Sequence, residues 1–343
     1  MNINNKNKIL MMLSIPIVIL VICIGTSIGS SNISIMDIIS IISNKVFNTN
    51  LLQEIESKDV AIIWSIRFPR VLLAFCVGGA LAVSGAVVQS VLKNPLASPY
   101  TLGVSSGASL GVGLLIVSGI TIPILGNFIL PVVGFVCSFS TMIIVLIFAS
   151  KVDRELSNTT IILTGMVFSL FFNAMLTTLT ALFTDKLQSI ALWQMGSFSM
   201  KGWTYLKAGV PFFIIGFIGV MIFTKEMDIL TFGEEQAKAV GVSIENIKRY
   251  LFICVAILTG AAVALSGTIG FVDLIAPHIV RKVFGAKHSV VIPMSFVFGG
   301  CLMVITDLIS RIIIAPSELP VGAVTALIGA PFFAYLYFKR SNR

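Results

Sequence analysis

The histidines, carboxylates and cysteines of this 343-residue chain do not form a pattern typical of catalysis or metal binding. Its two histidines, His278 and His288, stand near basic residues and have no cysteine or carboxylate at metal-ligand spacing. We expect both imidazoles to face solvent or lipid headgroups. Nothing in the sequence points to a Ser–His–Asp arrangement, and no G-x-x-x-x-G-K-[ST] loop is present to bind ATP. The sequence therefore predicts no metal site, no cofactor and no catalytic residue.

Three short polar features interrupt the otherwise apolar sequence. Arg67 and Arg70 flank Pro69 at the start of a long apolar run. The segment 93–100 contains two prolines, which cannot continue a helix, and so predicts a turn. The stretch 225–249, called here the inner polar segment, is the most polar continuous part of the chain. The simplest interpretation of the three features is an interface anchor, a turn and a surface loop.

The composition places the chain in a membrane. It is 57% hydrophobic and only 11% charged, with a mean hydropathy of +1.02, whereas soluble domains contain about 25% charged residues. A helix that crosses the hydrocarbon core needs about 20 mostly apolar residues. Because the backbone must satisfy its own hydrogen bonds in lipid, the long unalternated apolar runs select helices over a barrel. We therefore predict an all-α polytopic membrane protein with a single transmembrane domain over residues 1–343.

The net charge of +8 is explained by membrane topology, and we expect no nucleic acid partner. Of the 23 lysines and arginines, 15 fall on one side of the predicted spans and 8 on the other. The richer side is expected to be cytoplasmic. Both termini then lie in the cytoplasm, which requires an even number of spans in the cell membrane.

Hydropathy divides the chain into about ten expected spans, of which the eighth is short. The first follows Lys6 and Lys8 and is expected to be a retained span, not a signal peptide. A second extramembrane stretch, besides the inner polar segment, covers 30–65 on the outer side. The ten spans lie near 9–29, 66–92, 101–119, 122–149, 159–183, 205–224, 250–268, 269–284, 290–312 and 320–338.

Ionisable residues within these spans are few. Asp307 and Arg311 stand four residues apart, so that both side chains share one helix face and can pair. Asp273 lies in the short eighth span, where it is expected to pair with Arg281 or Lys282 or to face a transport path. A charge at the bilayer centre costs about 2.5–3.5 kcal/mol on insertion scales, and ion-coupled carriers concentrate a few there. This shortage argues against a proton symporter and suits a protein driven from outside the membrane.

An internal repeat is visible at an offset of 182 residues. GGALAVSG at 78–85 aligns with GAAVALSG at 260–267, and the same offset pairs Pro95 with Pro277. The shift equals five spans, an odd number, so the two copies are expected to be inverted in the membrane. The repeat halves cover about 66–183 and 250–338. The alternative is a chance likeness between alanine-rich helices.

Several longer motifs, in order along nearly the whole chain, resemble the iron-chelate and cobalamin uptake permeases of ATP-binding-cassette importers. Together they are specific, although no single one is. The motifs are RFPRVLLAFCVGGALAVSGAVVQSVLKNPLASPYTLGVSSGASLG (67–111), WQMGSF (193–198), AVGVS (239–243), GTIGFVDLIAPHIVR (267–281), TDLISR (306–311) and ELPVGAVTALIGAPFF (318–333).

The resemblance implies the type II importer fold, a homodimer of ten-span subunits with the substrate path along the dimer axis. It also implies two cytoplasmic ATP-binding-cassette ATPase subunits and an extracytoplasmic substrate-binding protein, so that this chain hydrolyses no ATP itself. The cargo expected from the family is a ferric siderophore, with haem and cobalamin as alternatives. The competing hypothesis from another class is an ion-coupled secondary transporter built on the same inverted repeat.

Matching the family motifs residue by residue assigns roles to three groups of positions. The arginines that pair with carboxylates of the binding protein are matched by Arg67, Arg70 and Arg311. The two turns of the cytoplasmic gate are matched by Asn94, Pro95, Leu96, Asn158 and Thr159. The helices that couple to the ATPase are matched by Glu234, Glu235, Ala237, Val240, Gly241 and Ser243.

One position departs from the family pattern. Where members usually read GFVGLI, this chain has Asp273, which puts a carboxylate where a small residue normally packs. With Asp307 it forms the candidate set of intramembrane polar residues.

Overall fold

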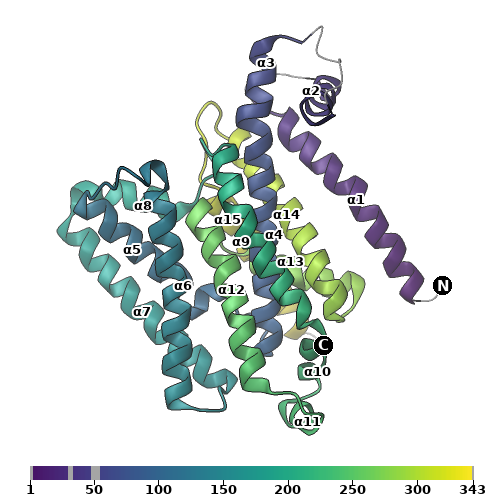
Figure 1. Ribbon diagram of the computed structural model, residues 1–343, viewed down its shortest axis with the longest axis vertical. Helices are drawn as coiled ribbons and strands as arrows, with labels where there is room; N and C mark the ends of the chain where they lie inside the picture. The colour runs from purple at the N-terminus through teal and green to yellow at the C-terminus, as the bar shows by residue number, and fades with distance from the viewer. Residues whose placement is uncertain (1–2, 30–33, 48–54, 342–343) are drawn as a thin grey trace.

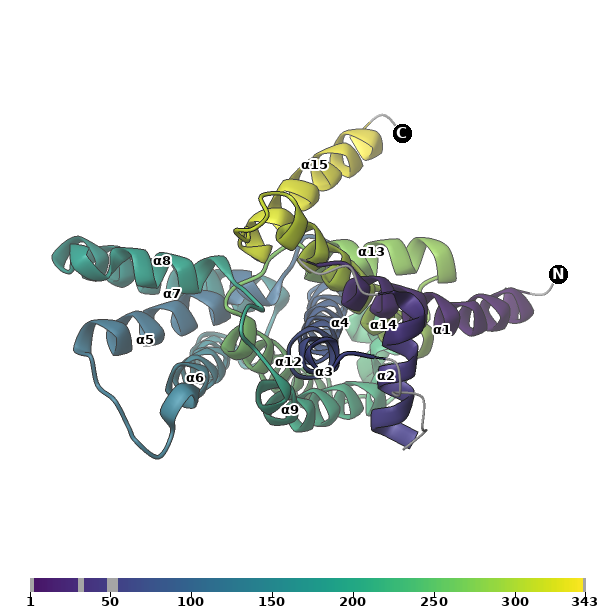
Figure 2. The ribbon, with the colours of Figure 1, turned by 90° about the horizontal axis from the view of Figure 1, so that it is seen from above.

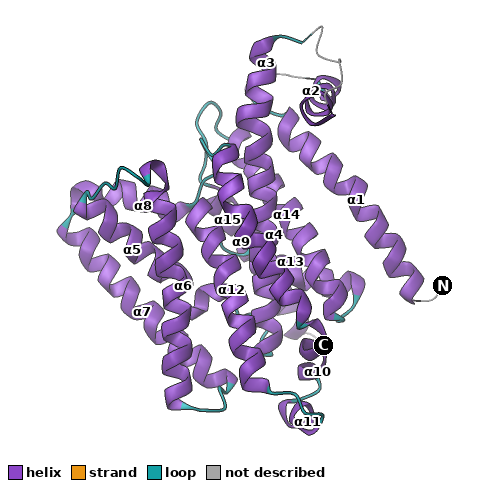
Figure 3. Cartoon of the chain, in the orientation of Figure 1, coloured by secondary structure: helices purple, strands orange, loops and turns teal. Residues whose placement is uncertain are grey.

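The computed structural model describes residues 3–29, 34–47 and 55–341, and all regular secondary structure within these ranges is helical (Figures 1 and 3). The prediction of an all-α membrane protein is confirmed. Each expected span contains one helix. In chain order these are α1 (Ile3–Ser27), α4 (Phe68–Val91), α5 (Val104–Ser118), α6 (Ile129–Val152), α7 (Asn158–Leu182), α9 (Trp203–Ile222), α12 (Ile244–Ser266), α13 (Val272–Phe284), α14 (His288–Ile312) and α15 (Val321–Ser341).

Shorter helices occupy the connections. The outer segment contains α2 (Ile35–Phe47) and α3 (Ser57–Ala61), and a π-helical stretch, Ile62–Arg67, joins α3 to α4. The inner polar segment contains α10 (Thr224–Thr231) and α11 (Glu234–Ala239). Hydropathy did not predict α8 (Leu187–Met195), because its 9 residues are too few to stand out as a span. Single 3-10 turns cover Pro99–Leu102, Gly126–Phe128 and Thr184–Lys186.

The helices differ in length, and one expected span is shorter than predicted. Among the described residues, 7 helices are long and apolar enough to cross a membrane, and the apolar parts of α5 and α15 are shorter. Helix α13 has 13 residues, or about 20 Å of rise, against a hydrocarbon core about 30 Å thick. The segment predicted as the eighth span is thus too short to cross the whole core as a helix.

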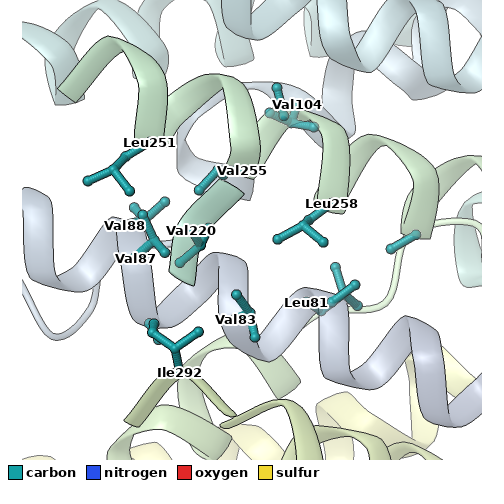
Figure 4. Close-up of a cluster of buried hydrophobic side chains, with 14 of the residues drawn as sticks. Leu81, Val83, Val87, Val88, Val104, Val220, Leu251, Val255, Leu258 and Ile292 are labelled. Carbon is teal, nitrogen blue, oxygen red and sulfur yellow. The ribbon is translucent and has the colours of Figure 1, made fainter. Parts of the chain in front are cut away.

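Helix α4 is the centre of the molecule, with α9, α12, α13 and α14 around it (Figure 2). Glycines allow the closest of these contacts: a Cβ added to Gly78 would overlap the carbonyl oxygen of Gly299 on α14. Lipid provides no hydrophobic force between helices, so close backbone approach supplies the packing energy. Figure 4 shows the apolar core between α4 and α12, where the buried side chains include Leu81, Val87 and Leu258.

Helices α5, α6, α7 and α8 form a second group at one side of α4 (Figure 1). Helix α6 contacts both α5 and α12 and so joins the two groups. Small residues again set the spacing, because a Cβ on Gly107 would overlap the Thr141 hydroxyl and one on Gly111 would overlap the Cys137 thiol.

The predicted repeat helices α4 and α12 run in opposite directions: α4 descends from α3, and α12 rises from beside α11 (Figure 1). Ser84 and Ser266, which the 182-residue offset pairs, are both buried and each donates to the carbonyl four residues earlier. The pair at Gly85 and Gly267 differs, since Gly85 lies within α4 and Gly267 follows the end of α12 at φ +79°. The inverted repeat stays a prediction.

Candidate functional site

At the expected outer end of α4, Arg70 is held between two carboxylates. Its Nη2 donates to Asp307 Oδ1 of α14 at 2.8 Å, and its Nη1 donates to Glu318 Oε1 at 2.8 Å. The planar guanidinium directs two nitrogens at each carboxylate, a bidentate geometry that the single nitrogen of a lysine could not provide. Arg70 and Asp307 are buried, whereas the Glu318 side chain is about one-third exposed, so the cluster runs from the interior to the surface.

Arg67 and Arg311 both donate to the C-terminal carbonyl groups of α1. Arg67 Nη1 is 2.8 Å from the Ser27 oxygen, and Arg311 Nη2 is 2.8 Å from the Gly25 oxygen. The last carbonyls of a helix lack intrahelical donors and carry partial negative charge, so cations stabilise them. Arg311 also pairs with Asp307 at 3.2 Å, which confirms the pair predicted from their four-residue spacing.

The three arginines predicted to dock the binding protein therefore gather at one end of the molecule. Their guanidinium groups contact groups of this chain, so a docking partner competes with α1 carbonyls and buried carboxylates. The docking role stays a prediction. Sequence reasoning missed Glu318, because it lies 248 residues from Arg70 and no spacing rule joins the two.

A pocket opens beside Arg70 and Glu318, and Lys201 is one of the residues that line it. Lys201 lies in the loop before α9 and donates from Nζ to the carbonyl oxygen of Leu265. Desolvation by burial, with the nearby charge of Arg70, lowers the pKa of Lys201 from 10.5 to about 8. This ammonium therefore loses its proton far more readily than an exposed lysine. The pocket is lined by Ser65, Ile66, Arg70, Ser199, Met200, Lys201, Gly202 and Glu318.

A second pocket, called here the hydroxyl pocket, lies between α5, α7, α8 and the loop before α13. Ser106 Oγ donates to Ser169 Oγ across it at 3.2 Å, and the Tyr100 hydroxyl donates to the Ile269 carbonyl at 2.9 Å. No spacing rule connects these segments, so the sequence did not reveal the pocket. Its lining carries no charge and consists of Tyr100, Ser105, Ser106, Ser109, Ser169, Asn173, Gln194, Thr268 and Gly270.

Asp273 is fully buried in the first turn of α13, and the structure corrects its predicted pairing. Its Oδ2 accepts a hydrogen bond from Ser98 Oγ, while its Oδ1 has no hydrogen-bond partner in the part of the chain that the structure describes. Arg281 instead donates to Gln89 Oε1 at 2.5 Å. Eight residues of helix separate Asp273 from Arg281, about 12 Å of rise, which is too far for a pair. The close packing expected of a small residue here is provided by Gly85, where a Cβ would overlap the Asp273 carbonyl oxygen.

The two predicted gate turns are well-defined structures at the expected inner end. In the first, Asn94 Oδ1 accepts from Leu96 N at 2.9 Å, an Asx-turn that leaves Leu96 exposed and Pro95 at the bend. Asn158 begins α7 directly after the second turn, and Thr159 is exposed beside it. That turn, 153–157, places the buried Leu156 at φ +52°.

The inner polar segment is fastened to the second gate turn by two lysines. The fully buried Lys248 donates from Nζ to Glu234 Oε1 and to the Leu156 carbonyl, each at 2.8 Å. Lys238 pairs with Glu155 of the same turn at 3.1 Å. The sequence contained no sign of either contact, because Lys238 of α11 and Lys248 of α12 lie 83 and 92 residues from their partners in the turn.

The residues predicted to couple to the ATPase divide into buried and exposed ones. Ala237 is fully buried against the body, whereas Val240 is 72% exposed and the nearby Phe232 is 78% exposed. Gly241 adopts φ +86°, which a side-chain-bearing residue would adopt only with strain, and so permits the turn into α12. Glu235 and Ser243 lie in the same short stretch, α11 and the residue before α12.

His288 is not exposed, so its predicted contact with solvent or headgroups is wrong. It is 2% exposed, and its Nδ1 lies 2.6 Å from Asp228 Oδ1 of α10 while its Nε2 lies 2.7 Å from Ser90 Oγ of α4. The Asp228 carboxylate also accepts from the His288 backbone N–H at 2.9 Å. The sequence could not predict this chain of contacts, since the three residues come from three different helices.

The structure is thus a bundle of closely packed helical spans with an ionic cluster at one end and short polar helices at the other, as expected of the membrane-spanning part of a transporter. The model of the FecCD transport family matches residues 17–339. This chain belongs to the FecCD transport family, and it is a permease subunit of an ATP-binding-cassette importer.

Individual relatives agree over the whole length. The chain is 42% identical over 319 residues to the uncharacterized ABC transporter permease YvrB of Bacillus subtilis (strain 168), covering 93% of this chain and 90% of that protein. It is 35% identical over 343 residues to the hemin transport permease HmuU of Yersinia pestis, covering 99% of each. A solved structure described as an inward-facing ABC transporter of metal-chelate type matches with a TM-score of 0.83 at 30% identity, covering 96% of this chain and 99% of that one. These similarities confirm the resemblance inferred from the motifs.

Proposed function

We propose that this permease carries an oxygen-rich iron chelate, a ferric siderophore, and that the hydroxyl pocket contacts the cargo. The pocket supports this cargo because it presents hydroxyl and amide groups, and no charge, inside an apolar body. Neutral donors and acceptors can bind the oxygen atoms of a chelate without placing an unpaired charge in the membrane. Haem and cobalamin are the alternative cargoes, and relatives are named for both.

The cargo path is proposed to lie between two copies of the chain. Asn173, in the middle of α7, lines the hydroxyl pocket and is exposed at the surface of the single chain. A carboxamide facing hydrocarbon without hydrogen bonds is costly, so this face of α7 requires a wet path or a second copy. The homodimer supplies both.

Two cytoplasmic ATPase subunits are proposed to bind the inner polar segment. Phe232 and Val240 are the large apolar side chains exposed there, on either side of α11. Exposed apolar residues flanked by polar ones are typical of a protein contact surface. The extracytoplasmic binding protein is proposed to dock at the opposite end, near Arg67, Arg70 and Arg311.

The chain is proposed to lie in the cell membrane with both termini in the cytoplasm. The excess of lysine and arginine on that side supports the orientation. The first two and last two residues lie outside the described residues. In Figure 1 the start of α1 and the end of α15 both lie in the lower half of the molecule, which also contains α11 of the inner polar segment.

Cargo is tested by uptake in a strain that lacks this gene, complemented with wild type or with Ser109→Ala, Asn173→Ala or both. We expect uptake of a ⁵⁵Fe-labelled hydroxamate siderophore to be restored by wild type and to fall about fivefold per lost hydrogen bond. Uptake of labelled haem or cobalamin, with no siderophore uptake, would reassign the cargo.

The partner surface is tested by co-purification. Phe232→Glu combined with Val240→Glu places two charges on the exposed apolar surface, and we expect loss of the ATPase subunits with normal membrane insertion. Leu192→Glu, at an exposed apolar residue of α8, is a control away from this surface. ATP hydrolysis by the purified chain alone, or cargo uptake driven by an ion gradient without ATP, would contradict the proposal and favour the secondary carrier.

A further inference from the structure

The chain Asp228–His288–Ser90 joins the inner polar segment to the inner end of the central helix. Asp228 belongs to α10, His288 begins α14, and Ser90 lies in the last turn of α4. Both ring nitrogens of His288 are engaged, at 2.6 Å from Asp228 Oδ1 and 2.7 Å from Ser90 Oγ. The distances match a nucleophilic Ser–His–Asp arrangement. The imidazole is nevertheless 2% exposed and fastened at both sides, so its surroundings are those of a structural connection.

The α4 end of this connection leads directly into the first gate turn. Ser90 precedes that turn by a few residues, and the Asn94 backbone N–H donates to the Gln89 carbonyl at 3.1 Å. A displacement of Ser90 therefore moves the turn 93–96 with it. The other end leads to the inner polar segment, where the apolar residue Phe232 is exposed beyond α10.

A second set of polar contacts holds the same part of α4 from the side of α13. Arg281 donates to Gln89 Oε1 at 2.5 Å and to the Ala86 carbonyl at 3.0 Å. Gln89 Nε2 donates to the Asp273 carbonyl at 3.1 Å, and Ser98, just beyond the gate turn, donates to the Asp273 carboxylate. The inner end of α4 is thus held by directional bonds, with His288 as its connection to α10.

Building on the proposed function, we propose that His288 is a positioning residue that transmits movement of the inner polar segment to the first gate turn. When a bound ATPase displaces α10, Asp228 moves with that helix. The buried His288 imidazole then moves with Asp228 and displaces Ser90 at the end of α4. Hydrogen bonds suit this role better than apolar contact because their short distances and directions allow little slip. Coupling then travels through one contiguous hydrogen-bonded connection, from α10 through His288 to the inner end of α4.

The test uses the permease in complex with its co-purified ATPase subunits in proteoliposomes. The reporter is Leu96→Cys, and the measurement is the rate at which this cysteine reacts with a membrane-impermeant maleimide. The same complex without Leu96→Cys gives the background from the native cysteines. With His288 present, we expect ATP plus vanadate to change this rate at least fivefold. With His288→Ala or Asp228→Ala added, we expect less than a twofold change while ATP hydrolysis stays within twofold of its starting value.

Ser90→Ala is the mild variant, because it removes one hydroxyl and leaves the His288–Asp228 contact intact. Its matched control is Ser84→Ala on the same helix, which removes a buried hydroxyl that donates to the Ala80 carbonyl of its own helix. We expect Ser90→Ala to weaken the nucleotide response and Ser84→Ala to leave it unchanged. Equal responses of Ser90→Ala, Ser84→Ala and the unsubstituted serines would overturn the inference.

A purely structural role would lower ATP hydrolysis, complex yield and gate response together, and this pattern in His288→Ala also counts against the proposal. The maleimide reaction is measured without cargo, so the test of His288 remains valid even if the proposed siderophore cargo is incorrect. If the chain were not ATP-driven, the complex with unsubstituted His288 would itself show no nucleotide response, which separates failure of the proposed function from failure of this inference.

Discussion

Arg70 forms ion pairs with two carboxylates, Asp307 and Glu318, at the expected outer end of the molecule. Asp307 is almost fully buried and Glu318 is about one-third exposed. A buried ion pair adds little net stability over an apolar replacement, but removing one partner leaves uncompensated charge in a low-dielectric site. Arg311 remains beside Asp307 and compensates part of that loss.

Arg70→Met is expected to destabilise the folded chain by about 3–5 kcal/mol, because Glu318 loses the cation it pairs with and Asp307 loses one of its two paired arginines. The measurement is unfolding by denaturant in mixed micelles. Lys186→Met, which removes an exposed cation paired with its neighbour Asp185, is the control and is expected to change stability by less than about 1 kcal/mol. Equal effects of the two substitutions would show that the cluster is not coupled to folding.

This result also bears on docking. Substituting the three arginines with glutamate would remove the proposed binding-protein contacts and would also disturb the end of α1 and the Arg70 cluster. Direct measurement of binding-protein affinity, beside the unfolding data, is needed to separate the two effects.

Lys201 gives a pH dependence with a defined sign. Its pKa is about 8 in the folded chain against 10.5 ordinarily, so between these values the unfolded state binds more protons. Stability then rises with pH from about 8 to 10.5, while below pH 8 the folded chain bears the full cost of burying the ammonium. As the pH rises from about 8 to 10.5, we expect the free energy of unfolding of the wild type to increase relative to that of Lys201→Met, by an amount on the order of 1–3 kcal/mol. A difference between the two chains that does not change with pH would contradict the prediction.

At the scale of elements, glycine sets how closely the helices approach. Gly78 on α4 and Gly299 on α14 meet backbone to backbone, and an added Cβ on either would overlap the other's carbonyl oxygen. In lipid this close contact cannot be replaced by a general hydrophobic force. The position of α14, and with it His288 and Asp307 at its two ends, therefore depends on residues without side chains.

Gly78→Ala is expected to cost about 1–3 kcal/mol, because α4 and α14 must separate to admit the methyl group. Gly270→Ala is the matched control, since nothing lies within 4 Å of its added Cβ and its φ is not in the left-handed region. Unfolding of both variants in the same micelles provides the comparison. If Gly78→Ala were no more destabilising than Gly270→Ala, the close contact would not be a source of stability.

At the scale of the whole molecule, the polar face of α7 is incomplete in one copy. Thr177 and Thr178 satisfy their hydroxyls within the helix by donating to the carbonyls four residues earlier. The side-chain amide of Asn173 has both an NH2 donor and a carbonyl acceptor, and the carbonyls of its own helix can bond only to the donor. Asn173 faces outward at the hydroxyl pocket. A single copy in lipid would leave that group exposed to hydrocarbon.

We expect the chain to purify as a dimer, with a mass near twice 36.9 kDa by native mass spectrometry before any ATPase is bound. Asn173→Leu is expected to leave the dimer and its ATPase contacts in place and to lower cargo uptake, because the path loses a hydrogen-bonding group. A monomer in mild detergent that also supports ATP-driven uptake would refute the dimeric path.

Much of the fold was predictable because the bilayer sets a simple rule. The thickness of the hydrocarbon core fixes the length of an apolar run, so the ten helices at the expected spans followed from hydropathy. The differences from prediction have physical causes: the 13 residues of α13 are too few to cross the whole core, and the 9 residues of α8 are too few to stand out as a span. The four-residue spacing of Asp307 and Arg311 was readable in the same way, since it depends only on helical periodicity.

The sequence by itself determined the class of protein, its helices, its family motifs and the ends at which its polar residues gather. Only the tertiary structure decided which buried polar groups meet. Arg70 finds Glu318, and His288 finds Asp228 and Ser90, across helices whose relative rotation depends on the packing of every neighbour. Local periodicity fixes contacts within a helix, whereas contacts between helices follow from the packed whole.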